Sequence, residues 1–503
     1  MNFFFRFDYN DIIGSGHLLR VKNLLVKILH NYQKKKIYII CRATLSERKQ
    51  IREHFKNLDI RIFFLSVKLK ISRNNYKTWL RVSEKNDAIQ TAKVCNHYSK
   101  SNKDLIFIDH YGITNRWLSF FSSKIRTILV DDYIRDKPNF DFVINGNAQI
   151  YKHFYKKKKL TNLLSGFDFA LYDPKYAPNY NKNLNKINIV IFFSNSDLSN
   201  FGYKILNLIY KFKNISLTLI SGTNSPIYKD TKKFKKYKNI KIIKFANNFE
   251  KIVKNTTLFI GSCGSTYINR IYYNIPSIVF KLSKNQEIFC NFIKDNKLGI
   301  YLGSELKFNK KVFLNTFNNL IKNKKKLREM SSNCKGRIDS YSINRILETI
   351  NPSNSNIAKL KPLLKKHKDI LYKWANDEDT VKSSLRNKKI TYIQHEKWFN
   401  KIYISKNVKI YLMYLKNLPI GQIRFDIFKK KILVDYSIDR FIRGKGYGNL
   451  LLKMGMKKIE KYKSKKIIEA VVKKSNSRSK KIFENLGFAK KVINNKIFKY
   501  TSV

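Results

Sequence analysis

Short hydrophobic runs alternate with longer amphipathic segments through the first 345 residues of the chain. The runs are rich in Ile, Val and Phe, and each is only long enough for a strand. In the first part of this region we expect strands at residues 3–7, 37–40, 60–65, 105–108, 125–130 and 142–144. A strand followed by an amphipathic helix, repeated, is typical of a parallel sheet covered by helices.

The alternation pauses at residues 171–183, which contain Pro174, Pro178 and many Asn and Tyr residues, and then resumes. The second series of expected strands is 187–193, 215–220, 240–245, 258–260 and 277–280. We therefore predict an α/β fold with two Rossmann-like halves, 1–175 and 184–345, in a GT-B-like arrangement whose cleft takes a nucleotide.

A polar breaker, Asn-Pro-Ser-Asn-Ser-Asn, occupies residues 351–356. The residues after it change to a mixture of helices and antiparallel-looking strands. We expect residues 357–503 to form a third, α+β domain.

The composition is that of a folded protein, with 43% hydrophobic and 27% charged residues. The net charge is not ordinary: 102 Lys and Arg against 35 Asp and Glu give +67. The lysines are scattered through every segment, which favours a composition bias spread over solvated faces. The alternative is a genuine polyanion-binding surface, including attraction for anionic sugar nucleotides.

The candidate metal and disulfide chemistry is sparse. The five cysteines are odd in number and far apart, and the eight histidines show no HExxH spacing. The apolar stretch at residues 2–7 is too short for a signal peptide and is interrupted by Arg6, and no run has the length of a membrane helix. We expect a cytoplasmic protein without a metal.

The first candidate for chemistry is His17. Gly14-Ser15-Gly16 predicts a tight turn after the strand at 3–7, and residues 17–29 predict a helix. His17 then stands at a helix N-terminus, where the helix dipole disfavours a protonated imidazole, so the ring can accept a proton from water or a hydroxyl. The glycines let a ligand approach the backbone. The alternative is a histidine that only caps or packs the helix.

Further polar motifs follow in a fixed order. The set comprises Arg6-x-Asp8, Gly14-x-Gly16-His17-x-x-Arg20, Trp79, Asp87-Ala88, Asp109-His110-Tyr111-Gly112, Asp131-Asp132, Asn145-Gly146-Asn147, Ser194-Asn195-Ser196-Asp197, Gly261-Ser262-Cys263-Gly264-Ser265-Thr266, Pro276 and Asn285-Gln286. This ordered set resembles the UDP-sugar hydrolase family of pseudaminic acid biosynthesis. The resemblance implies release of UDP from UDP-2,4-diacetamido-2,4,6-trideoxy-β-L-altropyranose by a relative of the GT-B glycosyltransferases.

The resemblance also implies residue roles. His17 corresponds to the base that activates water, and Asp109 and His110 are expected in the same cleft, unless they merely cap the turn after their strand. Gly264, Ser265 and Thr266 are suited to the pyrophosphate, or else form a plain capping turn, and Asn285 and Gln286 lie near the sugar. The remaining expected substrate contacts are Arg6, Asp8, Gly14, Gly16 and Arg20.

Two positions depart from that family's pattern. Residues 194–197 read Ser-Asn-Ser-Asp where the family usually has Gly-Gly-Ser-Asp, so side chains narrow the approach to the phosphates. Asn269 stands where an acidic residue commonly grips the ribose hydroxyls. Both departures predict altered UDP affinity or nucleotide choice.

The second candidate for chemistry lies near the C-terminus. A strand is expected at 432–438 and a helix at 449–462, and between them lie Arg443, Gly444, Lys445, Gly446, Tyr447 and Gly448. Glycines before a helix expose successive N–H groups to a pyrophosphate, and the basic side chains add charge. This loop resembles the acetyl-CoA signature of GNAT acetyltransferases, and Asn476, Ser479 and residues 483–488 resemble the closing elements of that fold. The alternative is a generic glycine turn.

Residues upstream of this loop resemble the GNAT branch that acetylates the 4-amino group of UDP-4-amino-4,6-dideoxy-β-L-AltNAc. Within that resemblance Trp374 can stack on uracil or sugar, Arg386 or Arg424 can meet phosphate, and His395 is the candidate base, with core packing as the alternative for the aromatic residues. A backbone N–H at residues 436–438 would polarise the thioester. Phe483 stands where many relatives carry a tyrosine that protonates the departing thiolate, so another group or water must do so.

Together the motifs predict a bifunctional enzyme that uses acetyl-CoA as cosubstrate and UDP-amino sugars as substrates, with no specific nucleic acid partner. One alternative is a GT-B-type glycosyltransferase joined to an amino-sugar acetyltransferase. The other is a non-enzymatic basic scaffold that binds polyanions, with salt-sensitive RNA binding.

Overall fold

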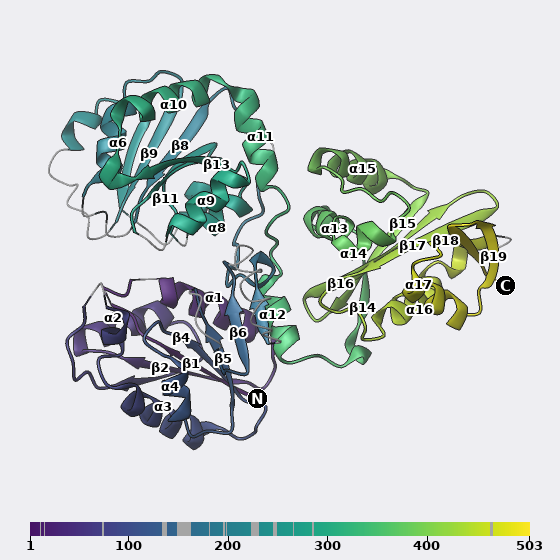
Figure 1. Cartoon of the computed structure of the whole chain (residues 1–503), viewed down its shortest axis with the longest axis horizontal. Helices are drawn as coiled ribbons and strands as arrows, with labels where there is room; N and C mark the ends of the chain where they lie inside the picture. The colour runs from purple at the N-terminus through teal and green to yellow at the C-terminus, as the bar shows by residue number, and fades with distance from the viewer. Residues whose placement is uncertain are drawn as a thin grey trace. The chain divides into compact units, whose positions relative to one another are not determined.

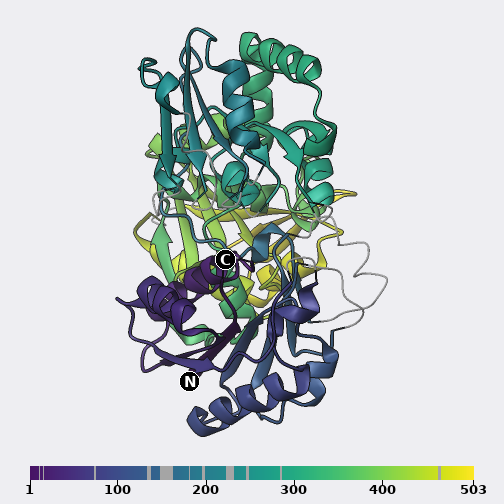
Figure 2. The same cartoon turned by 90° about the vertical axis from the view of Figure 1, so that its left-hand side faces the viewer.

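The computed structural model describes residues 1–10, 12–14, 16–72, 75–132, 138–147, 162–180, 182–194, 197, 199–222, 231–244, 249–264, 266–283, 286–462 and 466–502. The chain forms two compact units (Figures 1 and 2). The first unit comprises Met1–Cys334 and Ser342–Ile346, and the second comprises Lys335–Tyr341 and Leu347–Val503.

The first unit begins with a parallel sheet in the strand order β3-β2-β1-β4-β5-β6-β7. Its strands are β1 (Asn2–Phe7), β2 (Lys36–Arg42), β3 (Arg61–Leu65), β4 (Leu105–Asp109), β5 (Arg126–Val130), β6 (Phe142–Asn145) and β7 (Leu163–Ser165). The main helices are α1 (Gly16–Asn31), α2 (Leu45–Phe55), α3 (Glu84–Tyr98) and α4 (Asn115–Ser119). Figure 1 shows α1 and α2 on one face of the sheet and α3 and α4 on the other, so β1 is buried along its whole length.

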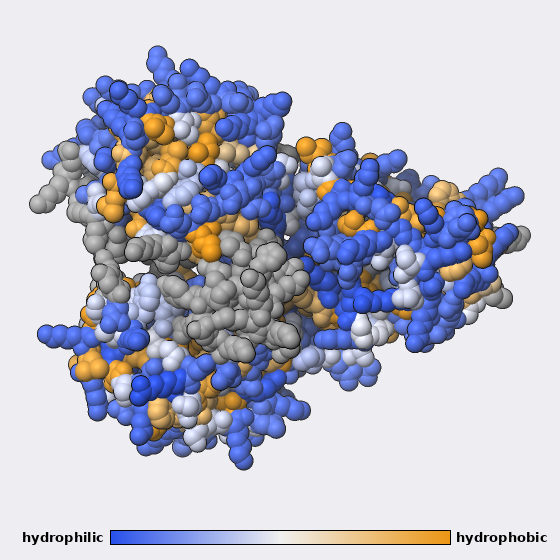
Figure 3. All heavy atoms as spheres, in the orientation of Figure 1, coloured by the Kyte–Doolittle hydropathy of each residue, from blue (hydrophilic) through white to orange (hydrophobic). Residues whose placement is uncertain are grey.

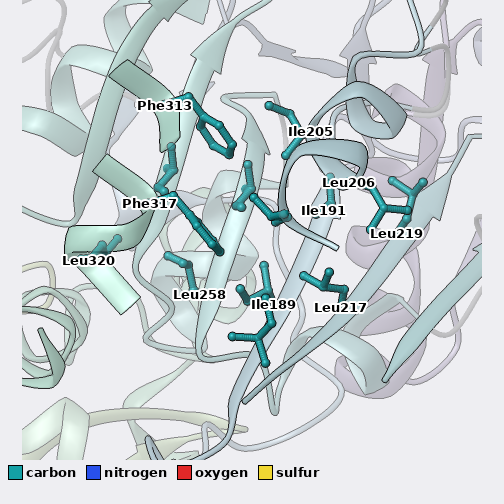
Figure 4. Packing of buried hydrophobic residues seen from close by; sticks show 14 of the residues in the cluster. Ile189, Ile191, Ile205, Leu206, Leu217, Leu219, Leu258, Phe313, Phe317 and Leu320 are labelled. Atoms are coloured by element: carbon teal, nitrogen blue, oxygen red, sulfur yellow. The ribbon is translucent and has the colours of Figure 1, made fainter. Parts of the chain in front are cut away.

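A second parallel sheet follows in the order β10-β9-β8-β11-β12-β13. Its strands are β8 (Ile187–Phe192), β9 (Ile215–Ser221), β10 (Ile240–Lys244), β11 (Leu258–Ser262), β12 (Ser277–Lys281) and β13 (Gly299–Ser304). The helices are α6 (Phe201–Ile209), α7 (Phe249–Val253), α8 (Tyr267–Tyr272), α9 (Glu287–Asp295), α10 (Lys310–Lys322), α11 (Lys324–Cys334) and α12 (Ser342–Ile350). Figure 4 shows Ile205 of α6 and Phe313 of α10 packed over Ile191 of β8.

The predicted strands of both halves are confirmed, with ends that differ by one or two residues. All strands of each sheet are parallel, but the strand order reverses at the centre, between β1 and β4 in the first sheet and between β8 and β11 in the second. In sheets of this kind ligands bind outside the carboxyl ends of the strands at such switch points. The fold therefore places the segments after Phe7, Asp109 and Ser262 at candidate binding edges.

The second unit contains a mixed sheet in the order β14-β15-β16-β17-β18-β20-β19. The strands are β14 (Lys359–Pro362), β15 (Val408–Leu415), β16 (Leu418–Ile427), β17 (Lys431–Ile438), β18 (Ile467–Lys473), β19 (Ala489–Asn494) and β20 (Ile497–Thr501). The helices are α13 (Lys368–Ala375), α14 (Glu378–Ser383), α15 (Tyr392–Ile404), α16 (Tyr447–Lys458) and α17 (Ser477–Asn485). In Figure 1, α13 and α15 cover one side of the sheet and α16 and α17 the other.

One pairing in this sheet is incomplete. β17 and β18 run parallel, but they pair only from Lys431↔Ile467 to Leu433↔Glu469. The ladder between the two strands therefore ends at Leu433, although β17 continues to Ile438.

Residues Lys335–Tyr341 belong to the second unit, although the sequence placed them in the second Rossmann-like half. Asp339 makes a 2.6 Å ion pair with Lys373 of α13. Gly336 has φ 69°, and a Cβ there would lie 2.5 Å from the ring of Tyr372. These contacts with α13 attach the segment to the second unit.

The five cysteines are buried and free of disulfides. Within the described ranges no group of His, Cys, Asp and Glu side chains could hold a metal ion. Among the described helices none is long and apolar enough to cross a membrane. Hydrophilic residues predominate on the face drawn in Figure 3, in keeping with lysines spread over solvated surfaces.

Candidate active sites

His17 and Asp109 meet at the switch point of the first sheet. His17 lies in the first turn of α1, which follows β1, and Asp109 ends β4. The imidazole Nδ1 lies 2.6 Å from Asp109 Oδ1, and both side chains are nearly inaccessible to solvent. Burial alone would raise the pKa of Asp109, but the charges of Arg20 and His17 outweigh it and lower that pKa to about 2.

This pairing determines which ring nitrogen of His17 is available for chemistry. Because Asp109 is ionised and can only accept, the proton of a neutral His17 ring resides on Nδ1. The Nε2 lone pair makes no hydrogen bond to any described residue. His17 therefore has the arrangement of a general base oriented by a carboxylate.

Arg20 links this pair to a second carboxylate. It donates from Nε and Nη2 to Asp109 at 2.9 and 2.7 Å, and it also pairs with Asp132. Asp132 accepts further hydrogen bonds at 2.5 Å from the Tyr111 hydroxyl and from Asn147 Nδ2. The Tyr111 ring lies 4.5 Å from the ring of His17, edge to face. The base is thus held by a network rather than by one contact.

The network reaches the second half of the first unit through Asn147. Its Oδ1 accepts a 2.9 Å hydrogen bond from the hydroxyl of Tyr267, the first residue of α8. Tyr267 directly follows the glycine loop at the end of β11. A chain of polar contacts thus links the residue after that loop to Asp132 and Arg20.

The two glycines before His17 border open space. Gly14 has φ 81°, which only glycine adopts without strain. A Cβ added at Gly14 or Gly16 would meet no atom within 4 Å. A ligand can therefore approach this turn closely, as predicted for a substrate site; Ser15 lies outside the described residues.

Three predicted site residues of this half are buried in a separate ion network. Arg6 pairs with Asp8 at 2.5 Å and with Asp87 at 2.6 Å, and all three are fully buried. His110 accepts the N–H of Gly112 on Nδ1 and turns Nε2 to within 3.3 Å of Asp8. The structure brings none of these side chains into contact with His17.

Arg6, Asp8 and His110 therefore make ion pairs inside this half, and the predicted catalytic role of His110 and substrate contacts of Arg6 and Asp8 stay predictions. Buried charges must be paired, and these pairs join β1, β4 and α3 inside the half. Burial also lowers the pKa of His110, which keeps the ring neutral. Their role in this conformation is to hold the strands that present His17 and Asp109.

The glycine loop of the second sheet lies at its switch point. A Cβ at Gly261 would come within 1.9 Å of the Phe192 carbonyl oxygen, so β8 and β11 approach too closely for any side chain there. Ser262 Oγ donates to the Phe193 carbonyl. A Cβ at Gly264 would meet only Ser262 Oγ at 3.7 Å and Gln286 Nε2 at 4.0 Å, so its surroundings are open.

The other predicted nucleotide contacts divide into three groups. Thr266 and Gln286 precede α8 and α9 and make no side-chain cap, which leaves the first N–H groups of both helices without a side-chain acceptor from these residues. Asp197 caps α6 by accepting the N–H groups of Phe201 and Gly202. Ser265, Asn285, Asn195 and Ser196 lie outside the described residues.

The loop between β17 and α16 has the geometry of a phosphate cradle. Gly444 and Gly446 have φ 83° and 82°, and a Cβ at either would meet no atom within 4 Å. Gly446 is the N-cap of α16 and provides no side-chain acceptor, so the N–H groups of Tyr447 and Gly448 are available to a ligand. Lys445 is exposed beside them.

The Arg443 guanidinium beside this loop is already ion-paired, and its predicted contact with the cofactor stays a prediction. Its guanidinium pairs with Asp377 at 2.7 Å and with Asp379 at 3.2 Å, and it donates to Thr380 Oγ1 at 2.9 Å. Its Nε donates to the Ile438 carbonyl. Arg443 therefore ties the loop to the N-terminus of α14 and to the end of β17.

Three predicted residues on the α13–α15 side are structural. His395 is fully buried, and Nε2 donates to the Lys368 carbonyl at 2.8 Å. Burial lowers its pKa to about 4. Trp374 is buried and donates to Asp439 at 2.8 Å. Arg386 is exposed, but its donors reach the carbonyls of Lys388 and Ala375.

In this structure neither the His395 ring nor the Trp374 ring reaches solvent, and their roles as a base and a stacking platform stay predictions. Arg424 is different. It lies on β16, is partly exposed, pairs with Asp426 at 3.2 Å, and stands 5.9 Å over the ring of Trp398. It remains accessible to an anionic group.

Asn476 and Ser479 begin α17. Asn476 Oδ1 accepts the N–H of Ser479 at 3.1 Å, so the amide caps the helix. Ser479 Oγ lies 3.0 Å from the hydroxyl of Tyr436 on β17. Phe483 is buried and its ring lies 6.0 Å from the Tyr436 ring.

Sequence reasoning assigned no role in either site to six side chains that take part in these contacts: Asp132, Tyr111, Asn147, Tyr267, Asp377 and Tyr436. Asp132 and Asn147 follow β5 and β6 at the same sheet edge as Asp109, and that position was a usable signal. No pattern pointed to Tyr436 as a hydroxyl beside Ser479, because the contact joins a strand and a helix 43 residues apart.

Comparisons with known proteins agree with this architecture. Residues 359–489 match the family model described as acetyltransferase (GNAT) domain. MurG of Acinetobacter baumannii superimposes with a TM-score of 0.50 at 11% identity, over 70% of this chain and 100% of that one. The chain thus combines a MurG-like GT-B region with a C-terminal GNAT acetyltransferase domain.

Other similar proteins cover parts of the chain. An uncharacterized protein of Methanocaldococcus jannaschii is 26% identical over 284 residues, which are 50% of this chain and about half (54%) of that protein. The N-acetyltransferase PseH of Campylobacter jejuni matches 29% of this chain and 97% of its own, at 20% identity and a TM-score of 0.24. Spermidine N-acetyltransferase of Vibrio cholerae, solved with CoA and spermine, matches 29% of this chain and 96% of its own, at 13% identity and a TM-score of 0.27.

Proposed function

We propose that this chain is a bifunctional nucleotide-sugar enzyme of pseudaminic acid biosynthesis. Its GNAT domain acetylates the 4-amino group of UDP-4-amino-4,6-dideoxy-β-L-AltNAc with acetyl-CoA. Its GT-B-like region then hydrolyses the product to UDP and 2,4-diacetamido-2,4,6-trideoxy-L-altrose. The ordered motifs of both regions support the substrate class, and these two reactions are consecutive.

The observation that carries the hydrolytic half is the 2.6 Å pair of His17 and Asp109 at the switch point. His17 Nε2 takes a proton from water as the oxygen attacks the anomeric carbon, and the C–O bond to UDP breaks. The imidazolium that forms is stabilised by Asp109. Inversion follows when water attacks opposite to the leaving UDP.

The leaving diphosphate needs groups that accept its negative charge. The open loop at Gly264 and Thr266, with Gln286 beside it, supplies backbone N–H groups and an amide at the edge of the second sheet. Tyr267 joins this loop to the network of the base. Binding of UDP and orientation of His17 are therefore coupled in this proposal.

Acetyl transfer requires a bound thioester and a neutral amine held at attack distance. The loop of Gly444, Lys445 and Gly446 would hold the CoA pyrophosphate at the N-terminus of α16. In this proposal the acyl chain lies beside β17 beyond Leu433, where the pairing with β18 has ended. Arg424 beside Trp398 is the candidate contact for the substrate's phosphate.

The test supplies purified protein with UDP-4-amino-4,6-dideoxy-β-L-AltNAc, with and without acetyl-CoA, and follows sugar masses and free UDP. We expect UDP release only with acetyl-CoA. The His17→Ala variant should accumulate the acetylated UDP-sugar. His30→Ala, an exposed histidine in the same helix α1, is the matched control and should behave as the wild type.

Other outcomes identify which half is wrong. A glycoside instead of free sugar would indicate a transferase with a sugar acceptor. UDP release that is unchanged in His17→Ala would remove His17 from the mechanism. Absence of both products, together with tight RNA binding that weakens steeply with salt, would favour the polyanion-binding scaffold.

A further inference from the structure

Two hydroxyl groups lie together in the second unit, beyond the point where the pairing of β17 with β18 ends. Tyr436 lies on β17 beyond Leu433, where the pairing with β18 has ended. Its hydroxyl is 3.0 Å from Ser479 Oγ in the first turn of α17. The hydroxyl pair therefore joins strand β17 to the helix that follows β18.

The same side chain lies against the candidate CoA loop. A Cβ at Gly448 would lie 3.6 Å from Tyr436 Cε2, so the phenol ring packs on the first turn of α16. That turn carries the N–H groups proposed for the pyrophosphate. A thioester bound at this loop and extended along β17 beyond Leu433 would lie beside the Tyr436 ring.

Phe483 cannot supply a proton, although its ring lies near Tyr436. It is 2% exposed and its ring stacks at 5.5 Å on Tyr500. The Tyr500 hydroxyl donates to Glu484 at 2.9 Å. The ring of Tyr436 on β17, which carries a hydroxyl, packs edge to face on the Phe483 ring with the ring centres 6.0 Å apart.

We propose that Tyr436 protonates the sulfur of coenzyme A as it leaves, and that Ser479 positions the Tyr436 hydroxyl. This inference rests on the proposed acetyl transfer. The Tyr436 hydroxyl takes the place of the hydroxyl that Phe483 lacks. Tyr436 is the catalytic residue here, and Ser479 is a positioning residue.

The step balances without any further reactant. The amine nitrogen forms a bond to the acetyl carbon, and the carbon–sulfur bond breaks with its electron pair on sulfur. Tyr436 gives its proton to that sulfur and becomes a phenolate. The nitrogen loses one proton to solvent, and the phenolate recovers one from solvent through Ser479.

The environment of Tyr436 suits a donor. Burial raises the pKa of its phenol, although the hydrogen bond from Ser479 opposes that rise, so the group keeps its proton at neutral pH. When Tyr436 donates to sulfur, Ser479 Oγ–H donates to the phenol oxygen. Ser479 itself is held by the N-terminal turn that Asn476 caps.

The first experiment measures binding and needs no amine. Calorimetry compares the full chain's affinity for coenzyme A and for desulfo-coenzyme A, which lacks the sulfur. We expect the wild type to prefer coenzyme A by about 3- to 10-fold, as one hydrogen bond allows. Tyr436→Phe should lose this preference while it keeps the affinity for desulfo-coenzyme A.

The second experiment measures the release of free coenzyme A thiol from acetyl-CoA. The acetyl acceptor is the UDP-amino sugar, or water in an assay of acetyl-CoA hydrolysis without the sugar. Tyr436→Phe should lower kcat by about 100-fold, the lower range for a general acid, with KM for acetyl-CoA within twofold of wild type. Ser479→Ala should lower kcat by a smaller factor. Tyr500→Phe loses a hydroxyl in the same aromatic cluster and should keep the wild-type kcat.

The outcomes separate this inference from the proposed function. If the protein binds neither ligand, the proposed acetyl transfer fails and the inference fails with it. If it binds coenzyme A and Tyr436→Phe keeps both the thiol preference and kcat, the inference alone is overturned. If Tyr436→Phe and Tyr500→Phe both lower kcat and both weaken the binding of coenzyme A and desulfo-coenzyme A, Tyr436 has only a packing role. That result also overturns the inference.

Discussion

Replacing Asp109 by Asn removes the charge that orients His17 while it keeps the size of the side chain. Asp109 is 1% exposed and accepts from His17 and from both Nε and Nη2 of Arg20. The amide can still accept one hydrogen bond, but it no longer requires the His17 proton to reside on Nδ1. We therefore expect a misoriented base and an imidazolium without its counter-charge.

Two magnitudes follow from this geometry. General bases contribute about 10²- to 10⁴-fold, so we expect UDP release to fall by at least about 100-fold, or about 2.7 kcal/mol of transition-state stabilisation. The pKa of Asp109 falls from 3.8 to about 2 in the folded chain. At about 1.4 kcal/mol per pKa unit, its ionised form stabilises the fold by an amount on the order of 2 kcal/mol.

The stability effect has a definite pH dependence. Because the folded pKa lies below the unfolded one, the stabilisation is present above pH 3.8 and is lost as the pH falls towards 2. Urea unfolding of wild type and Asp109→Asn at several pH values should give a difference in unfolding free energy that shrinks through this window. The comparison of two chains removes the general effect of the +67 net charge.

Asp59→Asn is the matched control, because Asp59 is exposed in the same half. It should leave UDP release and the unfolding free energy near wild type. The reasoning is refuted if Asp109→Asn releases UDP within threefold of the wild-type rate, since Asp109 would then not orient the base. A difference in unfolding free energy that grows as the pH falls would refute the assigned ionisation.

Three further predictions concern other parts of the chain. Gly261→Ala should destabilise the first unit by about 1–3 kcal/mol in urea unfolding, because its Cβ would come within 1.9 Å of the Phe192 carbonyl oxygen; an unchanged midpoint would contradict the close approach of the strands. Gly446→Ala should weaken acetyl-CoA binding several-fold by calorimetry, because φ 82° is strained for alanine, and equal affinity would show that the cradle is not used. Arg443→Ala should lower the melting temperature more than Lys445→Ala does, since Arg443 pairs with Asp377. Lys445→Ala should weaken acetyl-CoA binding at low salt more than Arg443→Ala does. A larger loss of acetyl-CoA affinity in Arg443→Ala would instead support Arg443 as a phosphate ligand.

Most strands of the two parallel sheets could be predicted from the chain alone, whereas β7 and β13 were not predicted. Runs such as residues 105–108 and 278–280 are apolar throughout and too short for surface helices, and they lie in the strands β4 and β12. The positive φ values of Gly14, Gly444 and Gly446 agree with the predicted turns. These features are local, because they depend on side-chain period and on backbone freedom within a few residues.

The role of each polar residue depended on the tertiary structure. Asp109 and His110 are neighbours, yet Asp109 meets His17 and His110 meets Asp8, since consecutive side chains of a strand point to opposite faces. Motif spacing could place both at the edge of β4 but could not show which face each side chain meets.

The same limit applies to the second unit. His395 and Trp374 have the residue types of a base and a stacking platform, but packing of α13 and α15 on the sheet removed both from solvent. The Tyr436 hydroxyl contacts Ser479 of α17 because the pairing of β17 with β18 ends at Leu433 and the N-terminal turn of α17 lies beside β17 there. Sequence therefore determined the elements and the local turns, whereas burial and long-range pairing decided which side chains face a ligand, because both depend on residues far apart in the chain.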